Sequence, residues 1–135
     1  MKLLADTSAL LALLFRDDRN HRAAAGFAQR SPQARFLLTE LIFGEVVTRL
    51  RARAGAERAV AVARDLLRSS RYELIFLDEG VLSGALARMA RFADKRLSLT
   101  DCASFEVMER LSLNSAFSFD RDFRDCGFAM FPEGQ

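Results

Sequence analysis

The sequence has few of the residue types on which several common protein classes depend. Its two cysteines, Cys102 and Cys126, lack CxxC spacing and are too few for a disulfide framework or a zinc site, which fits a reducing cytoplasm. A single histidine, His21, excludes a ribonuclease that uses two histidines as acid and base, and we expect this residue on the surface or at a helix start. No Gly-rich loop follows the first apolar run, which excludes a dinucleotide-binding module.

Long hydrophobic runs are also missing. No stretch is long enough to span a membrane. Residues 2–15 resemble a secretory signal, but Asp6 lies in the middle of the run and charged residues 16–19 follow it. We therefore expect no secretory signal and a cytoplasmic protein.

Neither sign of charge dominates the composition. The net charge is +2, which excludes a polycation, yet only Lys2 and Lys95 among the 20 basic residues are lysine and the rest are arginine. Arginine binds phosphate oxygens with two hydrogen bonds and stacks on bases, so this bias favours a nucleic-acid ligand, although decoration of exposed helix faces also explains it. The densest arginines, from Arg49 to Arg71, are the candidate surface for nucleic acid or a protein partner.

Half of the 135 residues are hydrophobic, including 12 Phe, which is ample for a core. Short apolar runs alternate with segments of helical character. We expect strands at residues 2–5, 36–38, 72–77, 116–119 and 128–131, and helices at 9–15, 20–29, 39–53, 56–69, 78–92 and 102–111. This alternation predicts an α/β fold, with a central, mostly parallel sheet flanked by helices on both faces. No linker or repeat divides the chain, so residues 1–135 are expected to form a single domain.

Four carboxylates occupy positions that a parallel sheet would bring together. Asp6 ends the first strand, Asp120 ends a later one, and Asp101 opens a helix after a loop. Glu45 lies among apolar residues in the helix that follows the second strand. Strand carboxyl ends and helix amino ends gather along one edge of such a sheet, where ligands bind.

Two of these positions also have a purely structural explanation as helix caps. Asp6 precedes a helix and could accept hydrogen bonds from its free N–H groups. Asp101 lies three residues after Ser98, the spacing of a capping box.

The other two positions have structural alternatives as well. Glu45 could pair with Arg49 one turn along its helix. Asp120 could be a turn residue, with Asp122 as a rival for its place in the acidic set.

The four positions together favour a metal site. An Asp at the end of an apolar strand is costly unless something positive neutralises it. Several carboxylates at one edge repel one another, and a divalent cation removes that repulsion. Oxygen ligands without Cys or His favour Mg²⁺, or Mn²⁺ as a substitute, over zinc.

Four segments carry these residues in the order Asp, Glu, Asp, Asp. They are LLADTSALLALL, TELIFGEVVTRLR, FADKRLSLTDCASFEVM and AFSFDRDFRDCGF. With these motifs the chain resembles PIN-domain proteins, close to the VapC-type toxin ribonucleases, over essentially its whole length. The resemblance implies a Rossmann-like fold, an acidic Mg²⁺ site, RNA as the substrate and frequently a homodimer.

The resemblance also implies roles for individual residues. Asp6, Glu45, Asp101 and Asp120 form the acidic site by that match, with Asp6 and Asp101 as the direct metal ligands. Asp94 matches a frequent acidic position and is expected nearby, while Thr7 and Ser118 match hydroxyl positions that orient the carboxylates.

The implied function is Mg²⁺-dependent hydrolysis of phosphodiester bonds in single-stranded or structured RNA, as a toxin with a small antitoxin partner. Two other functions stay open: a catalytically silent RNA- or protein-binding PIN-like domain, and a phosphohydrolase with an aspartyl nucleophile. The four carboxylates argue against the first. Ser8 stands where the second would carry another Asp. Small apolar surfaces at residues 56–63 and 81–90 predict a homodimer.

Overall fold

A five-stranded sheet runs through the computed structural model, which describes residues 1–134; Gln135, at the end of the expected domain, lies outside that range. The strands are β1 (Lys2–Ala5), β2 (Arg35–Thr39), β3 (Tyr72–Ile75), β4 (Ser115–Phe117) and β5 (Ala129–Phe131). They lie in the order β3-β2-β1-β4-β5, and all four pairings are parallel. The sheet predicted as mostly parallel is parallel throughout.

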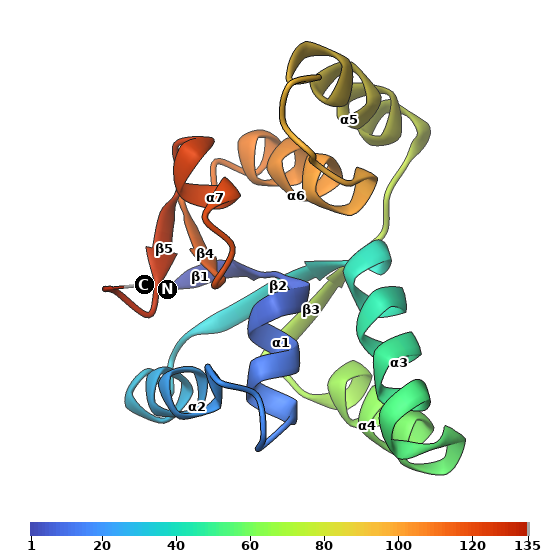
Figure 1. The fold of residues 1–135 in the computed structure, drawn as a ribbon, viewed down its shortest axis with the longest axis vertical. Helices are drawn as coiled ribbons and strands as arrows, with labels where there is room; N and C mark the ends of the chain where they lie inside the picture. The colour runs from blue at the N-terminus through green and yellow to red at the C-terminus, as the bar shows by residue number, and fades with distance from the viewer. Residues whose placement is uncertain (135) are drawn as a thin grey trace.

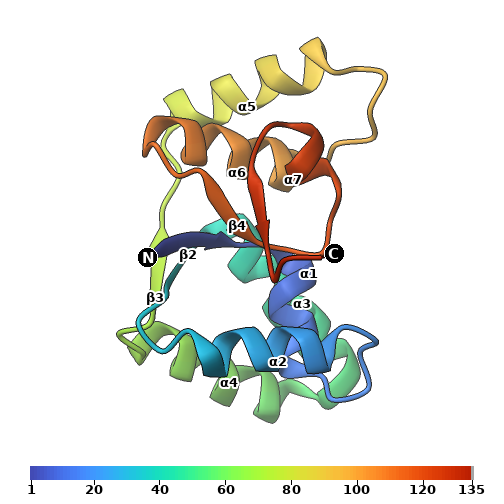
Figure 2. The same ribbon diagram turned by 90° about the vertical axis from the view of Figure 1, so that its left-hand side faces the viewer.

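Helices cover both faces of this sheet, as predicted (Figures 1 and 2). One layer holds α1 (Thr7–Leu14), α2 (His21–Arg30), α3 (Glu40–Ala54) and α4 (Ala56–Arg68). The other holds α5 (Glu79–Arg91), α6 (Leu99–Arg110) and α7 (Asp122–Asp125). Among the helices in residues 1–134, none combines the length and the apolar character needed to cross a bilayer.

The central strands are buried because both faces of the sheet are covered. Leu3, Leu4 and Ala5 of β1 are fully buried, as is Phe36 of β2. The rings of Phe36 and Phe117 lie 5.0 Å apart between centroids and so join neighbouring parts of one apolar core.

Side-chain caps begin three of the helices that leave the sheet. Asp6, Thr39 and Asp78 accept hydrogen bonds from backbone N–H groups at the starts of α1, α3 and α5. Gly55, with a φ of 88°, lies between α3 and α4, where a positive φ favours glycine. The caps place the starts of α1 and α3 at the carboxyl edge of the sheet.

Several predicted boundaries were wrong, most of them around this edge. The strand expected at 116–119 ends at Phe117, because Phe119 N–H donates to Ser8 Oγ and Asp120 N–H donates to Ser118 Oγ instead of extending the strand. Asp120 therefore follows β4 after a two-residue gap. The helix expected from residue 102 begins at Leu99, since Ser98 is its cap. The short helix α7 was not predicted.

The strand order creates a crevice beside β1. The chain adds β2 and β3 on one side of β1, and β4 and β5 on the other. In open α/β sheets, ligands bind outside the carboxyl ends of the strands where the order reverses in this way. Here that point lies between the ends of β1 and β4.

Candidate metal centre

A cleft of about 240 Å³ opens at the carboxyl ends of β1 and β4. Its lining comes from α1 and the residue before it, α3, α6 and the segment after β4: Asp6, Thr7, Ser8, Leu11, Ile42, Glu45, Arg49, Thr100, Asp101, Ser104 and Asp120. The structure thus brings together the four carboxylates that the sequence singled out, although they are spread over more than a hundred residues of chain.

Asp6 is the most buried of these carboxylates, with 6% of its surface exposed. Its Oδ1 accepts hydrogen bonds from Ala9 N–H at 3.0 Å and Ser8 Oγ at 2.7 Å, and its Oδ2 accepts one from Ser118 Oγ at 2.7 Å. Burial, with a smaller contribution from the charge of Asp120, raises the pKa of Asp6 to about 6 despite these bonds. Asp6 therefore caps α1 and also presents a carboxylate to the cleft.

Glu45 is held by two hydroxyl groups from different helices. Thr7 Oγ1 of α1 donates to its Oε1 at 2.8 Å, and Thr100 Oγ1 of α6 donates to its Oε2 at 2.7 Å. These bonds join α1, α3 and α6 around the carboxylate. Arg49, the alternative partner on the same helix, makes no ion pair with Glu45 among the described residues.

Three aspartates form the tightest acidic cluster. Asp101, Asp120 and Asp122 each offer a carboxylate oxygen, and these oxygens all lie within 4.8 Å of one another. Burial raises the pKa of Asp101 and that of Asp122, and the charge of Asp120 raises both further. Asp122, considered from the sequence only as a rival to Asp120, lies beside it.

Asp101 combines the two roles that the sequence left open. Its Oδ2 accepts the Ser98 N–H at 3.2 Å, and Ser98 Oγ accepts the Asp101 N–H at 3.0 Å, which completes a capping box at the start of α6. The same carboxylate belongs to the cluster of three aspartates.

The donor set fits a hard divalent cation. It consists of carboxylate and hydroxyl oxygens, the ligands that Mg²⁺ and Mn²⁺ prefer. The raised pKa values of Asp6, Asp101 and Asp122 express the cost of collecting carboxylates away from water, and a bound cation relieves that cost.

Small hydroxyl side chains hold the carboxylates in place. Ser118 is fully buried; its Oγ donates to Asp6 Oδ2 and accepts from Asp120 N–H, so it links the two acidic residues. Thr7, the other hydroxyl expected to orient a carboxylate, contacts Glu45. Sequence reasoning missed the contacts of Ser8 and Thr100. The only signal for them in the sequence was proximity to an acidic residue: Thr100 directly precedes Asp101, and Ser8 lies two residues after Asp6.

Other residues singled out from the sequence lie elsewhere. Asp94 is exposed in the loop between α5 and α6 and does not line the cleft. His21 begins α2, and its Nδ1 lies 2.8 Å from the Ala12 carbonyl oxygen, so it joins the start of α2 to α1. Cys102 is buried, Cys126 is half-buried, and both are free thiols.

Comparison with known proteins gives consistent matches along the chain. A family model described as PIN domain matches residues 3–129. The 23S rRNA-specific endonuclease VapC20 from Mycobacterium tuberculosis strain H37Rv is 30% identical over 127 residues, which are 93% of this chain and 95% of that protein. The crystal structure of M. tuberculosis VapC20, described as a Sarcin-Ricin loop cleaving toxin, covers 94% of this chain and 96% of its own, with a TM-score of 0.86 and 27% identity.

A more distant structure shares the fold alone. VapBC2 from Rickettsia felis, solved bound to a DNA fragment from their promoter, matches with a TM-score of 0.69 and 9% identity, over 96% of this chain and 97% of its own.

Proposed function

The chain belongs to the PIN-domain family, and we propose that it is a metal-dependent endoribonuclease of the VapC type, acting as one domain of residues 1–135. The observation that supports this most directly is the cleft itself. Carboxylates from four separate segments meet there, and three aspartate oxygens lie within 4.8 Å of one another. A domain that only bound RNA or protein would gain nothing from this repulsion, which argues against the catalytically silent alternative.

We assign Asp6, Asp101, Asp120 and Asp122 as the residues that would hold Mg²⁺, or Mn²⁺ in its place. Asp6 Oδ2 accepts only one hydrogen bond, from Ser118, and so keeps a free lone pair for a cation. When bound, such an ion activates water for attack on phosphorus and neutralises charge on the phosphate oxygens.

The remaining polar residues of the cleft would act by keeping the carboxylates in place. Glu45 accepts hydrogen bonds from Thr7 and Thr100 and so holds α1, α3 and α6 in fixed positions around the cleft. Ser118 keeps Asp6 and Asp120 at a constant separation. An aspartyl-nucleophile reaction is less favoured, because Ser8 stands where that mechanism would carry a second Asp, and Ser8 Oγ donates to Asp6 Oδ1 instead.

The similarity to VapC20 makes 23S rRNA the first RNA to test. Purified protein is incubated with ribosomes in Mg²⁺, and cuts are mapped by primer extension. We expect one or a few defined cuts with wild type and none in EDTA or with Asp101→Asn. Intact 23S rRNA with wild type in both Mg²⁺ and Mn²⁺ would exclude this substrate, and intact defined single-stranded and hairpin RNAs as well would contradict the proposed function.

We also propose a small antitoxin as the partner, since VapBC complexes share this fold. Action on an intracellular RNA would place the protein in the cytoplasm. Expression of the chain alone should arrest bacterial growth, and co-expression with a small reading frame that overlaps it upstream should restore growth. Growth that continues during expression of the soluble, active protein would contradict the toxin role.

A further inference from the structure

Arg49 is the single positively charged side chain on the described lining of the acidic cleft. It lies on α3, four residues after Glu45, and therefore on the same face of the helix. Four carboxylates share the cleft with it. A cation at this place calls for an explanation, because none of these carboxylates pairs with it within residues 1–134.

The Arg49 guanidinium is free for an external ligand. The side chain is exposed, and no hydrogen bond, ion pair or ring contact joins it to another residue within 1–134. Glu45, its neighbour one turn back, is occupied by Thr7 and Thr100.

Arg53 lies one turn further along α3 on the same face, and its side chain is bound to other residues of the chain. Its Nη2 donates to both carboxylate oxygens of Asp17, at 3.0 and 2.8 Å, and its guanidinium carbon lies 4.0 Å from the centre of the Phe15 ring. Arg53 thus fixes the end of α3 to the segment after α1. Of these two arginines, only Arg49 is available to a ligand in the cleft.

The cleft extends from the carboxylates toward Arg49 along the groove between α1 and α3. Both helices begin at the carboxyl edge of the sheet and run away from it on the same side (Figure 1). Leu11 and Arg49 each lie four residues, or about 6 Å of helix rise, beyond Thr7 and Glu45. One end of the cleft is therefore acidic, and the other presents an apolar side chain and a guanidinium.

We propose that Arg49 binds a phosphate of the RNA strand next to the phosphate that is cut. The proposal rests on the proposed function and names how that site holds its substrate. A guanidinium binds a phosphate with two parallel hydrogen bonds, and Leu11 beside it offers an apolar surface for a sugar or base. Arg49 is thus a substrate-binding residue that offsets the repulsion between an acidic cleft and a polyanion.

The same helix supplies a matched control. Arg51 is exposed, two residues along α3 and so about 200° around its axis, and it does not line the cleft. Arg49→Gln and Arg51→Gln remove the same charge from the same helix, and they differ in which face they change.

Binding is measured by fluorescence anisotropy with a labelled RNA hairpin in Mg²⁺, with Asp101→Asn as the cleavage-deficient parent for all variants. Arg49→Gln should weaken binding about tenfold and reduce the slope of log K against log salt by about 0.7, while Arg51→Gln leaves both near the parent values. Arg49→Lys should recover part of the affinity. Equal melting temperatures confirm that all variants fold.

A second arm locates the contact on the RNA. Single phosphates of the hairpin are replaced, one at a time, by neutral methylphosphonates. At one position the replacement should weaken RNA binding by the parent protein. The same replacement should cause no further loss of RNA affinity in Arg49→Gln, which already lacks that contact. If Arg49→Gln binds as the parent does, or loses only what Arg51→Gln loses, Arg49 is ordinary surface and the inference is overturned. Wild type that neither binds nor cleaves the hairpin in Mg²⁺ would instead contradict the proposed function.

Discussion

Asp101 is a helix-capping residue and a member of the acidic cluster at once. Its Oδ2 accepts the Ser98 N–H, while Asp120 and Asp122 bring like charges within 4.8 Å. Capping favours the carboxylate at this position and repulsion disfavours it in the absence of a cation. Two substitutions separate these contributions, because one removes the charge and the other removes the acceptor too.

Asp101→Asn keeps an oxygen that can accept the Ser98 N–H and deletes one negative charge. In metal-free buffer with EDTA we expect it to melt at or above the wild-type temperature. Asp101→Ala also loses the acceptor, so its free energy of unfolding should lie about 1 kcal/mol below that of Asp101→Asn. If the Asn variant is as unstable as the Ala variant, charge repulsion in the cluster contributes nothing measurable.

Asp6 predicts a pH dependence for the metal-free protein. Its pKa is raised from 3.8 to about 6 in the fold, so the folded protein holds a proton that the unfolded chain releases between these values. The contribution of Asp6 to unfolding free energy is therefore fully present below pH 3.8 and falls as pH rises to about 6, by about 3 kcal/mol.

Urea unfolding across that pH interval in EDTA measures this contribution as the difference between wild type and Asp6→Asn. The asparagine variant should lack the decline that wild type shows. Parallel profiles for the two proteins would mean that burial does not raise the Asp6 pKa.

The sequence could single out four of the acidic residues because Asp6 and Asp120 follow apolar strands, Asp101 lies at a helix start and Glu45 is an acid among apolar residues of a helix. It could not place Asp122, whose approach to Asp120 depends on the turn that follows β4. Nor could it show that Arg49 faces the cleft while Arg53 binds Asp17, since both lie on one helix face. Such choices depend on tertiary contacts that periodicity does not encode.

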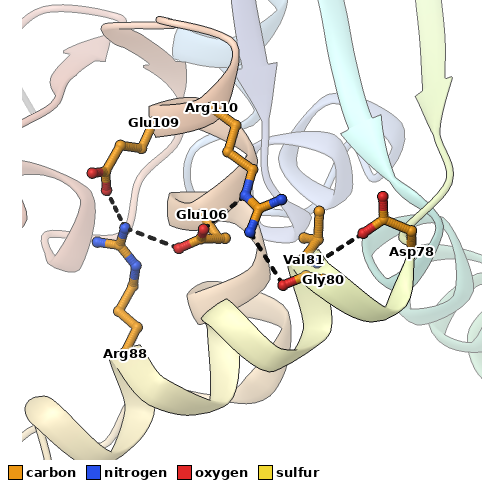
Figure 3. Close-up of polar contacts among 7 residues, drawn as sticks. All are labelled: Asp78, Gly80, Val81, Arg88, Glu106, Glu109 and Arg110. Carbon is orange, nitrogen blue, oxygen red and sulfur yellow. Dashed lines mark hydrogen bonds and ion pairs between the residues drawn. The ribbon is translucent and has the colours of Figure 1, made fainter.

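At the level of elements, α5 is the outermost helix and packs mainly on α6 (Figures 1 and 2). A charged network joins the two helices (Figure 3). Arg88 pairs with Glu106 and Glu109, and Arg110 donates to Glu106 at 2.8 Å and to the Gly80 carbonyl at 3.2 Å. Glu106 accepts hydrogen bonds from both arginines, and these interactions lower its pKa.

Glu106→Ala should therefore destabilise the protein. The Arg88 side chain is only 14% exposed and would lose one of its two carboxylate partners, so we expect the free energy of unfolding to fall by about 2 kcal/mol. Asp65→Ala is the control, because its pair with Arg68 is largely exposed and should be worth less than about 0.5 kcal/mol. Urea denaturation compares them; equal small losses would show that the network does not hold α5.

The long helices and the buried strand β1 were predicted well, whereas the end of β4 and the short helix α7 were not. The helix over residues 56–69 agrees with α4 within a residue because good helix formers run through it. The four-residue α7 and the end of β4 depend on side-chain to backbone bonds from Ser8, Ser118 and Asp120. These contacts form only once distant segments meet.

For the whole molecule, the alternation of strands and helices predicted the parallel sheet, but not the strand order that opens the crevice beside β1. The predicted homodimer depends on apolar surface at residues 56–63 and 81–90, and these lie on α4 and α5, on opposite sides of the sheet (Figure 1). Two separate faces are therefore candidates, marked by the exposed Leu67 and Leu86.

Light scattering at micromolar concentration should give about twice the 15.1 kDa chain mass. Leu67→Glu and Leu86→Glu place a charge on each face, and the one on the true interface should yield monomers. A monomer mass for wild type would contradict the predicted homodimer.

The central claim is that the carboxylates of the cleft bind a divalent cation. Calorimetric titration with Mn²⁺ tests it without knowledge of the RNA. Wild type should bind saturably, Asp101→Asn and Asp120→Asn should bind at least tenfold more weakly, and the exposed-site control Asp65→Asn should match wild type. Wild type that binds no Mn²⁺ and no Mg²⁺, or variants that all bind equally, would contradict the account.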